Sequence, residues 1–449
     1  MREAAPKLLT RDQLSWLAVV RADRDNILAA LRYWCDADDA ENALSLAVSL
    51  TIMTLLLGNE SDTAEWIGEA LAVPGEADTG LRTLAEALHV VLSVMEPMST
   101  ITDAALASDT YPGLVERLDA VDIGAYPVAG LLRPVFAMFV KDDRRALKYL
   151  DQARAGRDEW LVAATWMMTA THAENEGNLA EMRVAAAEAV AQFRALGERW
   201  GLSSALRTVG NIALLDGDLD AAIAAFTEAG RLLEEIGHRE DESQVQLRLA
   251  EIAARQGDLA RARALSAAAW SAAEAVGSPI DRGVAATWWA GFEATWGDMD
   301  AARPLHADAE RLLARFSPVH PVREHLEAMV ANTGALIAIA DKDVRGAREQ
   351  SVRAYRAAVA AQDMPLLALA SGAVAQLAFT LGHHERAAEL LGARTVVRGG
   401  DDPTDPIAVQ LAPRLRAALG DDRYATRYAS GRAFSRAEAI ERLDPAALD

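Results

Sequence analysis

The sequence is almost devoid of cysteine, since Cys35 is the only one among 449 residues. An internal disulfide is therefore impossible, which is typical of a protein in a reducing compartment. Aromatic residues make up only 6% of the chain, whereas apolar residues as a group reach 51%. That apolar content is enough for a buried core and excludes a chain that is disordered throughout.

Long hydrophobic runs are also missing. The first 30 residues are interrupted by Arg and Asp and contain no sustained apolar core of a signal peptide. The longest apolar runs, such as 47–57, fall far short of the roughly 20 residues that a membrane-spanning helix needs. We therefore expect a cytoplasmic protein.

Positive charge is scarce. The 45 basic residues, of which only four are lysine, face 66 acidic ones, and the formal net charge is −21. Duplex nucleic acid carries about one negative charge per 1.7 Å, so it would be repelled by this segment as a whole. We expect no direct contact between the segment and nucleic acid.

The familiar motifs of catalysis and metal binding are absent as well. No lysine follows a glycine, so no phosphate-binding P-loop exists, and neither a GxSxG elbow nor an HExxH motif occurs. The eight histidines show no ligand spacing with carboxylates or cysteine. The sequence thus predicts no catalytic residues, no cofactor and no metal site.

What the chain does have is an internal repeat with a period of about 40 residues. A glycine followed by Asn or Asp recurs four times at constant spacing, at Gly177-Asn178, Gly217-Asp218, Gly257-Asp258 and Gly297-Asp298. Weaker copies stand at Lys141-Asp142, Lys342-Asp343 and Gly382-His383. Glycine ends one helix in the left-handed region, and the Asn or Asp side chain caps the next helix. Each pair predicts a tight turn between two helices.

The segments around these turns have helical spacing. Apolar or small residues at i, i+3, i+4 and i+7 mark 206–213, and a second stripe marks 219–226. Gly210 and Ala222 would let the two helices approach closely, with Phe226 filling the space beside them. This arrangement resembles the tetratricopeptide repeat, whose bulky, Leu-Gly, aromatic, Ala and Phe positions correspond to Leu206, Val209-Gly210, Ala213, Ala222 and Phe226.

We accordingly predict an all-α fold, an open right-handed stack of helical hairpins that forms a tetratricopeptide-like α-solenoid with a period of about 40 residues. Loops are expected at 72–80, 109–113 and 398–406, and at the proline pair within 317–321. We expect a helical entry segment at 1–75, followed by irregular helical hairpins at 76–135. The repeat array is expected at 136–395 and a C-terminal helical cap at 396–449.

Both ends of the chain resemble a narrower family. The stretch WL…RDNILAALRYW within 14–34, and the segments AAELLGA at 387–393 and LGDDRY…GRAFS within 419–435, are similar to the sensor region of actinobacterial AfsR/SARP and LuxR-type regulators. In those proteins the sensor follows a nucleotide-switch (STAND) ATPase module. The resemblance implies a sensing array that controls an ATPase and a DNA-binding domain. The sequence is then either an excised fragment or a stand-alone reading frame that kept only the sensor.

Partner binding is expected in the concave groove, which the first helix of each hairpin would line. Outward positions there are Arg207, Asn211, Gln244, Arg248, Glu251, Trp288 and Glu293. Arg207 and Asn211 lie four residues apart and share a helix face, like the basic residue and Asn with which some tetratricopeptide domains hold a peptide carboxylate. Trp288 and Trp289 are adjacent, so only one of them can face the groove. An ordinary polar groove wall is the alternative interpretation.

Three functions remain open at this point. The chain is a non-catalytic sensor that binds a protein, a peptide or a small inducer; or it is a stand-alone adaptor that binds a protein or peptide; or it is an enzyme with an unrecognised site in the groove. Self-association through the edges of the stack is also possible.

Overall fold

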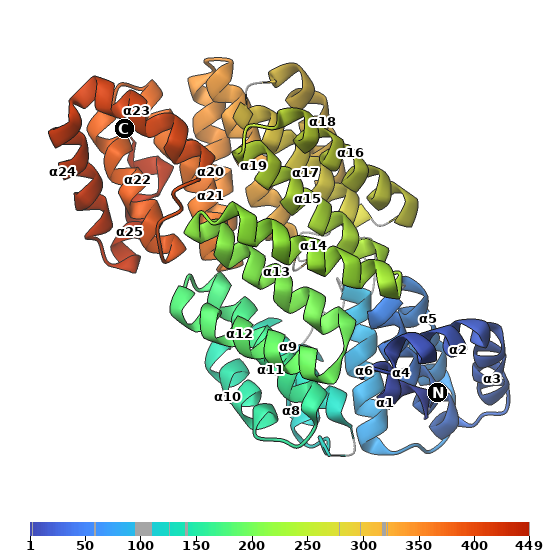
Figure 1. Cartoon of the computed structure of the whole chain (residues 1–449). Coiled ribbons are helices and arrows are strands. Elements are labelled where there is room, and N and C mark those ends of the chain that lie inside the picture. The colour runs from blue at the N-terminus through green and yellow to red at the C-terminus, as the bar shows by residue number, and fades with distance from the viewer. Residues whose placement is uncertain are drawn as a thin grey trace.

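The computed structural model describes residues 1, 3–57, 60–94, 110–124, 126–139, 142–277, 279–296, 298–316, 320 and 322–448. Over these ranges the chain is helical and contains no β-strand, and the helices stack side by side into a curved array (Figure 1). The predicted all-α, tetratricopeptide-like solenoid is confirmed. Lys141, Gly297, Asp109 and most of the 317–321 loop, which entered the sequence-based predictions, lie outside the described residues. The loop expected at 109–113 was wrong for 110–113, which are the start of a helix, Thr110–Asp119.

The N-terminal third forms a bundle of shorter and longer helices. They are α1 (Ala4–Leu8), α2 (Gln13–Ala22), α3 (Arg24–Asp36), α4 (Ala40–Leu57), α5 (Glu60–Ala72), α6 (Thr79–Val94), α8 (Thr110–Asp119), α9 (Pro127–Phe139) and α10 (Asp143–Arg154). One buried apolar cluster, from Ala4 to Phe136, runs through all of these helices except α10.

Regular hairpins follow, with helices of 15 to 18 residues. The pairs are α11 (Glu159–Asn175) with α12 (Leu179–Leu196), α13 (Arg199–Asp216) with α14 (Leu219–Ile236), α15 (Arg239–Arg255) with α16 (Leu259–Val276), α17 (Pro279–Trp296) with α18 (Met299–Leu313), α19 (Arg323–Ala340) with α20 (Val344–Ala361), and α21 (Met364–Thr380) with α22 (His384–Arg398). The chain ends in α23 (Pro406–Leu419), α24 (Asp421–Arg432), α25 (Arg436–Arg442) and the short 3₁₀ helix η1 (Pro445–Ala447).

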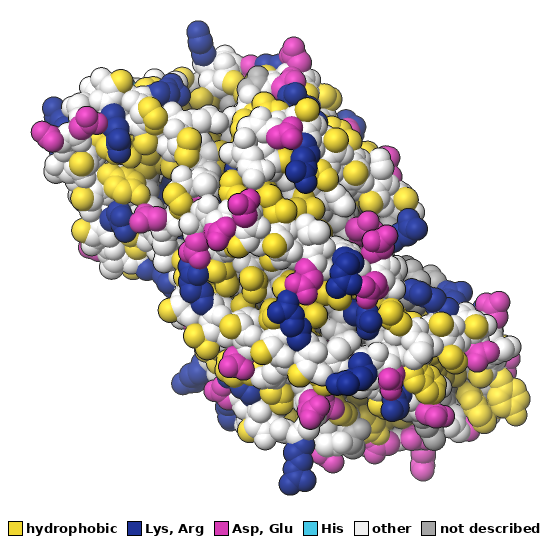
Figure 2. Space-filling model, in the orientation of Figure 1, with side chains coloured by type: hydrophobic (Ala, Val, Ile, Leu, Met, Phe, Trp, Pro, Cys, Tyr) yellow, Lys and Arg dark blue, Asp and Glu magenta, His cyan; other side chains and the backbone are white. Residues whose placement is uncertain are grey.

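Two surface properties bear on the sequence-based expectations. On the face shown in Figure 2, Lys and Arg side chains are scattered among Asp and Glu side chains and do not gather in one area. Within the part of the chain that the structure describes, no helix combines the length and the apolar character needed to cross a membrane.

The repeat turns have the predicted chemistry. Gly217 takes a left-handed φ of 74°, and the Asp218 carboxylate accepts a hydrogen bond from the backbone N–H of Ala221 at 3.0 Å. The turns at Gly177 and Gly257 have the same geometry, and Asp298 caps α18 in the same way. Only glycine adopts this backbone conformation without steric cost, which explains why it recurs.

A second series of glycine turns lies halfway between the first. Gly197, Gly237 and Gly277 have φ of 73°, 72° and 80° and end the second helix of their hairpins. This series was not predicted from the sequence, although its members are spaced as evenly as those of the first series. The two series together divide each repeat into two halves of similar length.

Close packing within a hairpin follows the predicted stripe. A Cβ atom at Gly210 of α13 would lie only 2.7 Å from the Phe226 ring of α14, so only glycine fits there. Phe226 and Ala222 are completely buried. Deleting a ring of this kind typically costs about 3–5 kcal/mol of stability, which makes Phe226 a main anchor of the hairpin.

The N-terminal helix α2 packs on one edge of the array, at the second series of turns. Gln13 of α2 donates to the Glu198 carboxylate at 2.6 Å and accepts from the backbone N–H of Arg199 at 3.0 Å. Glu198 is fully buried, and this burial raises the pKa of its carboxyl group. Further along α2, the Arg21 guanidinium donates to the Ile236 carbonyl at 2.5 Å.

The segment 397–406 packs on the opposite edge, at the first series of turns. A Cβ atom at Gly177 would lie 2.5 Å from the Val397 carbonyl oxygen, and one at Gly217 would lie 2.6 Å from the Pro403 ring. The stack is therefore not open along its whole length, and the prediction of an open stack was wrong on this point. The array curves until the end of α22 touches the turn of the α11–α12 hairpin and the loop after α22 touches the turn of the α13–α14 hairpin, both of which come much earlier in the chain.

Ser435 and Glu438 form a reciprocal capping box at the start of α25.

Candidate functional site

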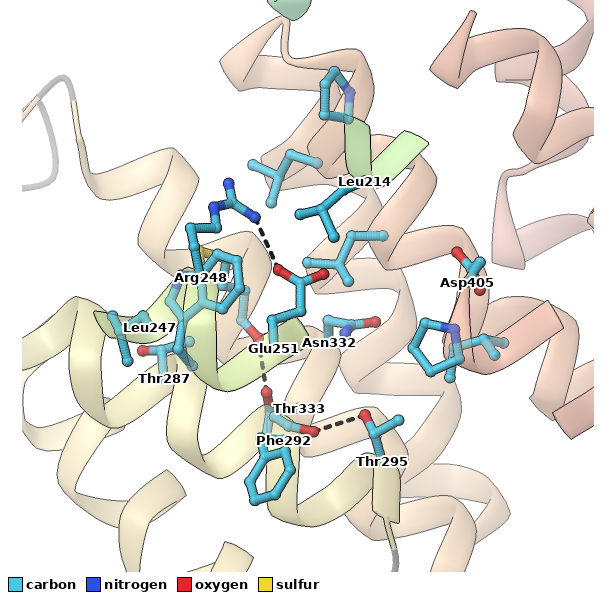
Figure 3. Close-up of a pocket in the computed structure, with 18 of the residues that line it drawn as sticks. Leu214, Leu247, Arg248, Glu251, Thr287, Phe292, Thr295, Asn332, Thr333 and Asp405 are labelled. Atoms are coloured by element: carbon cyan, nitrogen blue, oxygen red, sulfur yellow. Dashed lines mark hydrogen bonds and ion pairs between the residues drawn. The ribbon is translucent and has the colours of Figure 1, made fainter. Parts of the chain in front are cut away.

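A cavity of about 340 Å³ lies inside the curve of the array. The first helices of the hairpins, α11, α13, α15, α17, α19 and α21, form most of its wall, and residues 394–407 complete it (Figure 3). We call this space the first cavity. Its volume falls in the range of small-molecule binding sites, about 300–1,000 Å³.

The lining residues recur with the sequence repeat. Arg248 and Trp288 occupy equivalent positions in two successive repeats, and so do Glu251 and Gly291. All four residues line the first cavity. The residues equivalent to Arg248 in the two preceding repeats are Met168 and Thr208, and those equivalent to Glu251 are Thr171 and Asn211. These four also face the interior of the array. One face of the first helix is thus presented inward in each hairpin, while its residues vary freely from repeat to repeat.

Most of the wall of the first cavity is apolar. Leu214, Leu247 and Phe292 approach it from three successive hairpins, and Ile407 closes it from α23. The Arg248 guanidinium lies 4.5 Å from the centroid of the Trp288 ring, a cation–π contact that fixes both side chains.

A second cavity of about 590 Å³ continues from the first toward α9 and α10. Three residues line both spaces, namely Glu174, Asn211 and Arg248. The second cavity is lined further by Met138, Met167, Met168, Trp200, Arg207 and Gln244. The concave interior is therefore continuous, with the three shared residues at the junction.

Glu174 and Asn211 contact each other at this junction. The Asn211 Nδ2 group donates to Glu174 Oε1 at 2.9 Å. The Asn211 Oδ1 atom is buried and has no hydrogen-bond partner among the described residues. Burial raises the pKa of Glu174, while the positive charge of Arg248 and the bond from Asn211 act in the opposite direction.

A buried ionic cluster seals the end of the first cavity; we call it the clasp and define it as Arg255, Arg394, Arg398, Asp402 and Asp405. Arg255 of α15 contacts Asp402 at 3.0 Å, across 147 residues of sequence. Arg394 and Arg398 contact Asp405 at 3.0 and 3.3 Å. The two arginines hold the pKa of Asp405 well below its usual range, although burial alone would raise it.

Glu251 connects the clasp to the junction. It lies 3.0 Å from Arg248 and 2.7 Å from Arg255. Burial would raise the pKa of this carboxyl, but the two arginines outweigh it and lower the pKa to about 2. Glu251 therefore stays ionised and holds both guanidinium groups in place.

The structure brings six of the seven predicted groove residues to these cavities. Asn211, Arg248, Glu251 and Trp288 line the first cavity, while Arg207 and Gln244 line the second and contact each other at 3.1 Å. Arg207 also pairs with Asp241 at 3.2 Å.

Glu293 is the exception. It lies five residues after Trp288, about 140° around the helix, and so points away from the cavity. Its side chain is only 2% exposed and pairs with Arg263 of α16 at 2.8 Å. Trp289 lies beside it, packs among apolar residues of α15 and α16, and donates its Nε1–H to Glu293 at 3.2 Å.

Several cavity residues were not predicted from the sequence, among them Glu174, Asn332, Arg398 and Asp405. One signal was available for Glu174: the equivalent residues of the next three repeats, Leu214, Ala254 and Ala294, are all apolar. A carboxylate among them stands out. The described residues contain no group of three or more His, Cys, Asp or Glu that could hold a metal ion.

Comparison with known proteins gives the fold. No family model and no curated protein matches the sequence. Among solved structures, a Rap protein complexed with the Competence and Sporulation Factor aligns with 86% of this chain and 99% of its own, at a TM-score of 0.56 and 11% identity. At this identity the likeness shows the helical-repeat fold alone.

Two further structures match with lower scores. A STAND protein with a tetratricopeptide repeat sensor from Pyrococcus horikoshii has a TM-score of 0.38 and 13% identity, over 81% of this chain and 55% of that one. Yeast Tom70 has a TM-score of 0.42 and 12% identity, over 91% of each chain.

Proposed function

We propose that this chain is the sensing region of a STAND-type transcriptional regulator of the AfsR/SARP or LuxR type. In this proposal it acts in the cytoplasm and controls transcription through an ATPase switch and a DNA-binding domain outside this sequence. The observation that supports sensing is the first cavity, whose wall joins successive hairpins to the clasp. A ligand there contacts segments that are far apart in the sequence and stabilises the arrangement in which they meet. The end segments at 14–34 and 387–435 support the regulator assignment.

The proposed role is binding without chemistry, and two carboxylates of the cavity support this. The carboxylates Glu251 and Asp405 are held ionised by arginines, so neither is poised to transfer a proton near neutral pH. The occupant in this proposal is a protein segment, a peptide or a small inducer.

A ligand screen tests the sensing role. Peptides and metabolites are screened for an increase in the melting temperature of the wild-type chain, because a ligand that binds only the folded state raises it. Leu369 lines the cavity and is 41% exposed, so Leu369→Trp fills the space without disturbing the core. The control is Val184→Trp on α12, where the side chain is 60% exposed and outside the cavity.

We expect hits that raise the melting temperature of the wild type and of Val184→Trp but not of Leu369→Trp. If every hit acts equally on Leu369→Trp, the first cavity is not the site and the proposal fails.

A stand-alone adaptor that binds a protein or peptide is the second candidate. The second cavity favours it, because a wide recess lined by three methionines suits a chain segment of variable shape. The coding sequence upstream of Met1 separates the two functions. In-frame codons for a P-loop ATPase and a DNA-binding domain support the regulator, whereas a stop codon and a separate promoter support the adaptor.

A further inference from the structure

The chemistry of the first cavity points to a class of ligand, and the argument starts at Glu174. This carboxylate faces both cavities and receives one hydrogen bond, from Asn211. Among the described residues it has no arginine, lysine or histidine within ion-pair distance. The positive charges of Arg248 and Arg398 lower its pKa, but both guanidinium groups are already paired with other carboxylates.

Every other carboxylate around the cavity has its own partner. Glu251 pairs with Arg248 and Arg255, and the two clasp aspartates pair with Arg255, Arg394 and Arg398. Asp363 caps α21 and lies 3.5 Å from His325. The charged side chains that line the first cavity are four arginines, Arg248, Arg255, Arg394 and Arg398, and four carboxylates, Glu174, Glu251, Asp363 and Asp405. Within the described part of the chain, Glu174 is the lining carboxylate that no Arg, Lys or His side chain reaches within ion-pair distance.

Five polar side chains of the wall present acceptor atoms. The hydroxyls of Thr287, Thr295 and Thr333 donate their protons to backbone carbonyls one turn earlier, at 2.6, 2.7 and 3.2 Å. Each therefore presents only lone pairs to the cavity. The Oδ1 atoms of Asn211 and Asn332 are buried and unpartnered among the described residues. Asn332 is only 6% exposed, and Figure 3 shows it among the lining side chains.

Two donors without a partner also occur, Arg255 Nε and Arg398 Nε. Both belong to guanidinium groups of the clasp, whose other nitrogens contact Asp402 and Asp405. They therefore lie in a part of the wall that is already rich in carboxylate oxygen. At the junction, the Glu174 carboxylate and the Asn211 Oδ1 atom remain as acceptors, and the neighbouring Arg248 guanidinium is paired with Glu251.

We propose that the first cavity binds a protonated primary amine attached to an apolar body, with the ammonium group held by Glu174 and Asn211 Oδ1. The apolar body lies against Trp288, Phe292 and Leu214. This inference rests on the proposed function, since it names the ligand class of the same cavity. A small amine and the free N-terminus of a peptide share this chemistry.

The test uses isothermal titration calorimetry with matched probes. The small-amine arm compares 2-phenylethylamine with 3-phenylpropanoate, which has a similar body and the opposite charge. The peptide arm compares Phe-Leu-amide with its N-acetylated form, which lacks the ammonium group. Each probe is titrated into the wild type, Glu174→Gln and Glu188→Gln; Glu188 is an exposed glutamate of α12, so its variant makes the same charge change away from the cavity.

We expect at least one of the two amines to bind, and its carboxylate or acetylated counterpart to bind at least tenfold more weakly. Glu174→Gln is expected to weaken amine binding at least tenfold, and Glu188→Gln to leave it within twofold. Glu174→Gln should fold normally because it removes a buried charge that has no counter-ion, and circular dichroism checks this. Binding by 2-phenylethylamine alone identifies a small amine as the source, and binding by Phe-Leu-amide alone identifies a peptide.

The ligand class is overturned if no amine probe binds, if the carboxylate or N-acetylated counterparts bind as tightly as the amines, or if Glu174→Gln binds amines as the wild type does. None of these results refutes the proposed function by itself. That function fails only when the ligands from the screen raise the melting temperature of Leu369→Trp as much as that of the wild type.

Discussion

Asp402→Asn is the change that most directly tests whether the clasp closes the array. The side chains of Asp402 and Arg255 are only 2% and 3% exposed, and Arg398 contacts the same carboxylate at 3.2 Å. Removing the charge of Asp402 leaves two buried guanidinium groups with one fewer counter-ion. Breaking a buried pair in this way costs about 3–5 kcal/mol, which makes separation of 399–406 from α15 easier by a factor of roughly 100 to 5,000.

Hydrogen exchange measured by mass spectrometry follows this separation locally. Peptides that cover 399–406 and the first turn of α23 should lose protection in Asp402→Asn, while peptides of α4 and α5 should not change. Asp422→Asn serves as the control, because Asp422 lies exposed in the first turn of α24. A double-mutant cycle with Arg255→Met then isolates the pairwise energy.

Two results would refute the reasoning. Exchange of 399–406 in Asp402→Asn within about threefold of the wild type would mean that the clasp does not hold this segment. A coupling energy below about 0.5 kcal/mol in the cycle would mean that Arg255 and Asp402 act independently.

Three further predictions concern the core, the acid limb and the cavity. Phe226→Ala should lower the free energy of unfolding of its hairpin by about 3–5 kcal/mol in urea titrations, whereas an effect below about 1 kcal/mol would contradict the packing described. Because the pKa of Asp405 is lower in the folded than in the unfolded state, its ionised carboxylate stabilises the fold fully above the unfolded-state pKa of about 4, and this stabilisation is lost as the pH falls below that value. In urea titrations from pH 6 to pH 3, the free energy of unfolding should therefore fall less steeply for Asp405→Asn than for the wild type. An unchanged slope would count against the ion pairs of Asp405 with Arg394 and Arg398. Trp288→Ala should weaken ligands from the screen at least tenfold while the circular dichroism spectrum stays unchanged, and full retention of affinity would exclude Trp288 from the site.

The hairpins were predictable because their determinants are local. A glycine that must turn left-handed and an aspartate that must cap the next helix lie side by side, as at Gly217 and Asp218. The same holds for the stripe that places Gly210 against Phe226. Each of these contacts joins residues of one hairpin, so the helical period alone specifies it.

The closure of the array and half of the site were not predictable in this way. Arg255 meets Asp402 across 147 residues, and no local pattern in 398–406 reveals that it faces α15 rather than solvent. Glu293 was misplaced for a related reason, since a polar residue on a predicted inner helix can pair with the neighbouring α16 instead of the groove. Glu174, by contrast, differs from its repeat equivalents and could have been singled out by aligning the repeats.

The seating of 397–406 on the turns at Gly177 and Gly217 also constrains how this protein can evolve. Ordinary solenoids gain or lose whole units by duplication or deletion, because each unit contacts only its neighbours. Here a whole hairpin added or deleted between 217 and 397 would carry the returning segment away from the two glycines that receive it. The number of hairpins is therefore fixed by the curvature of the array. Related sequences should differ in surface residues and cavity side chains rather than in the number of hairpins.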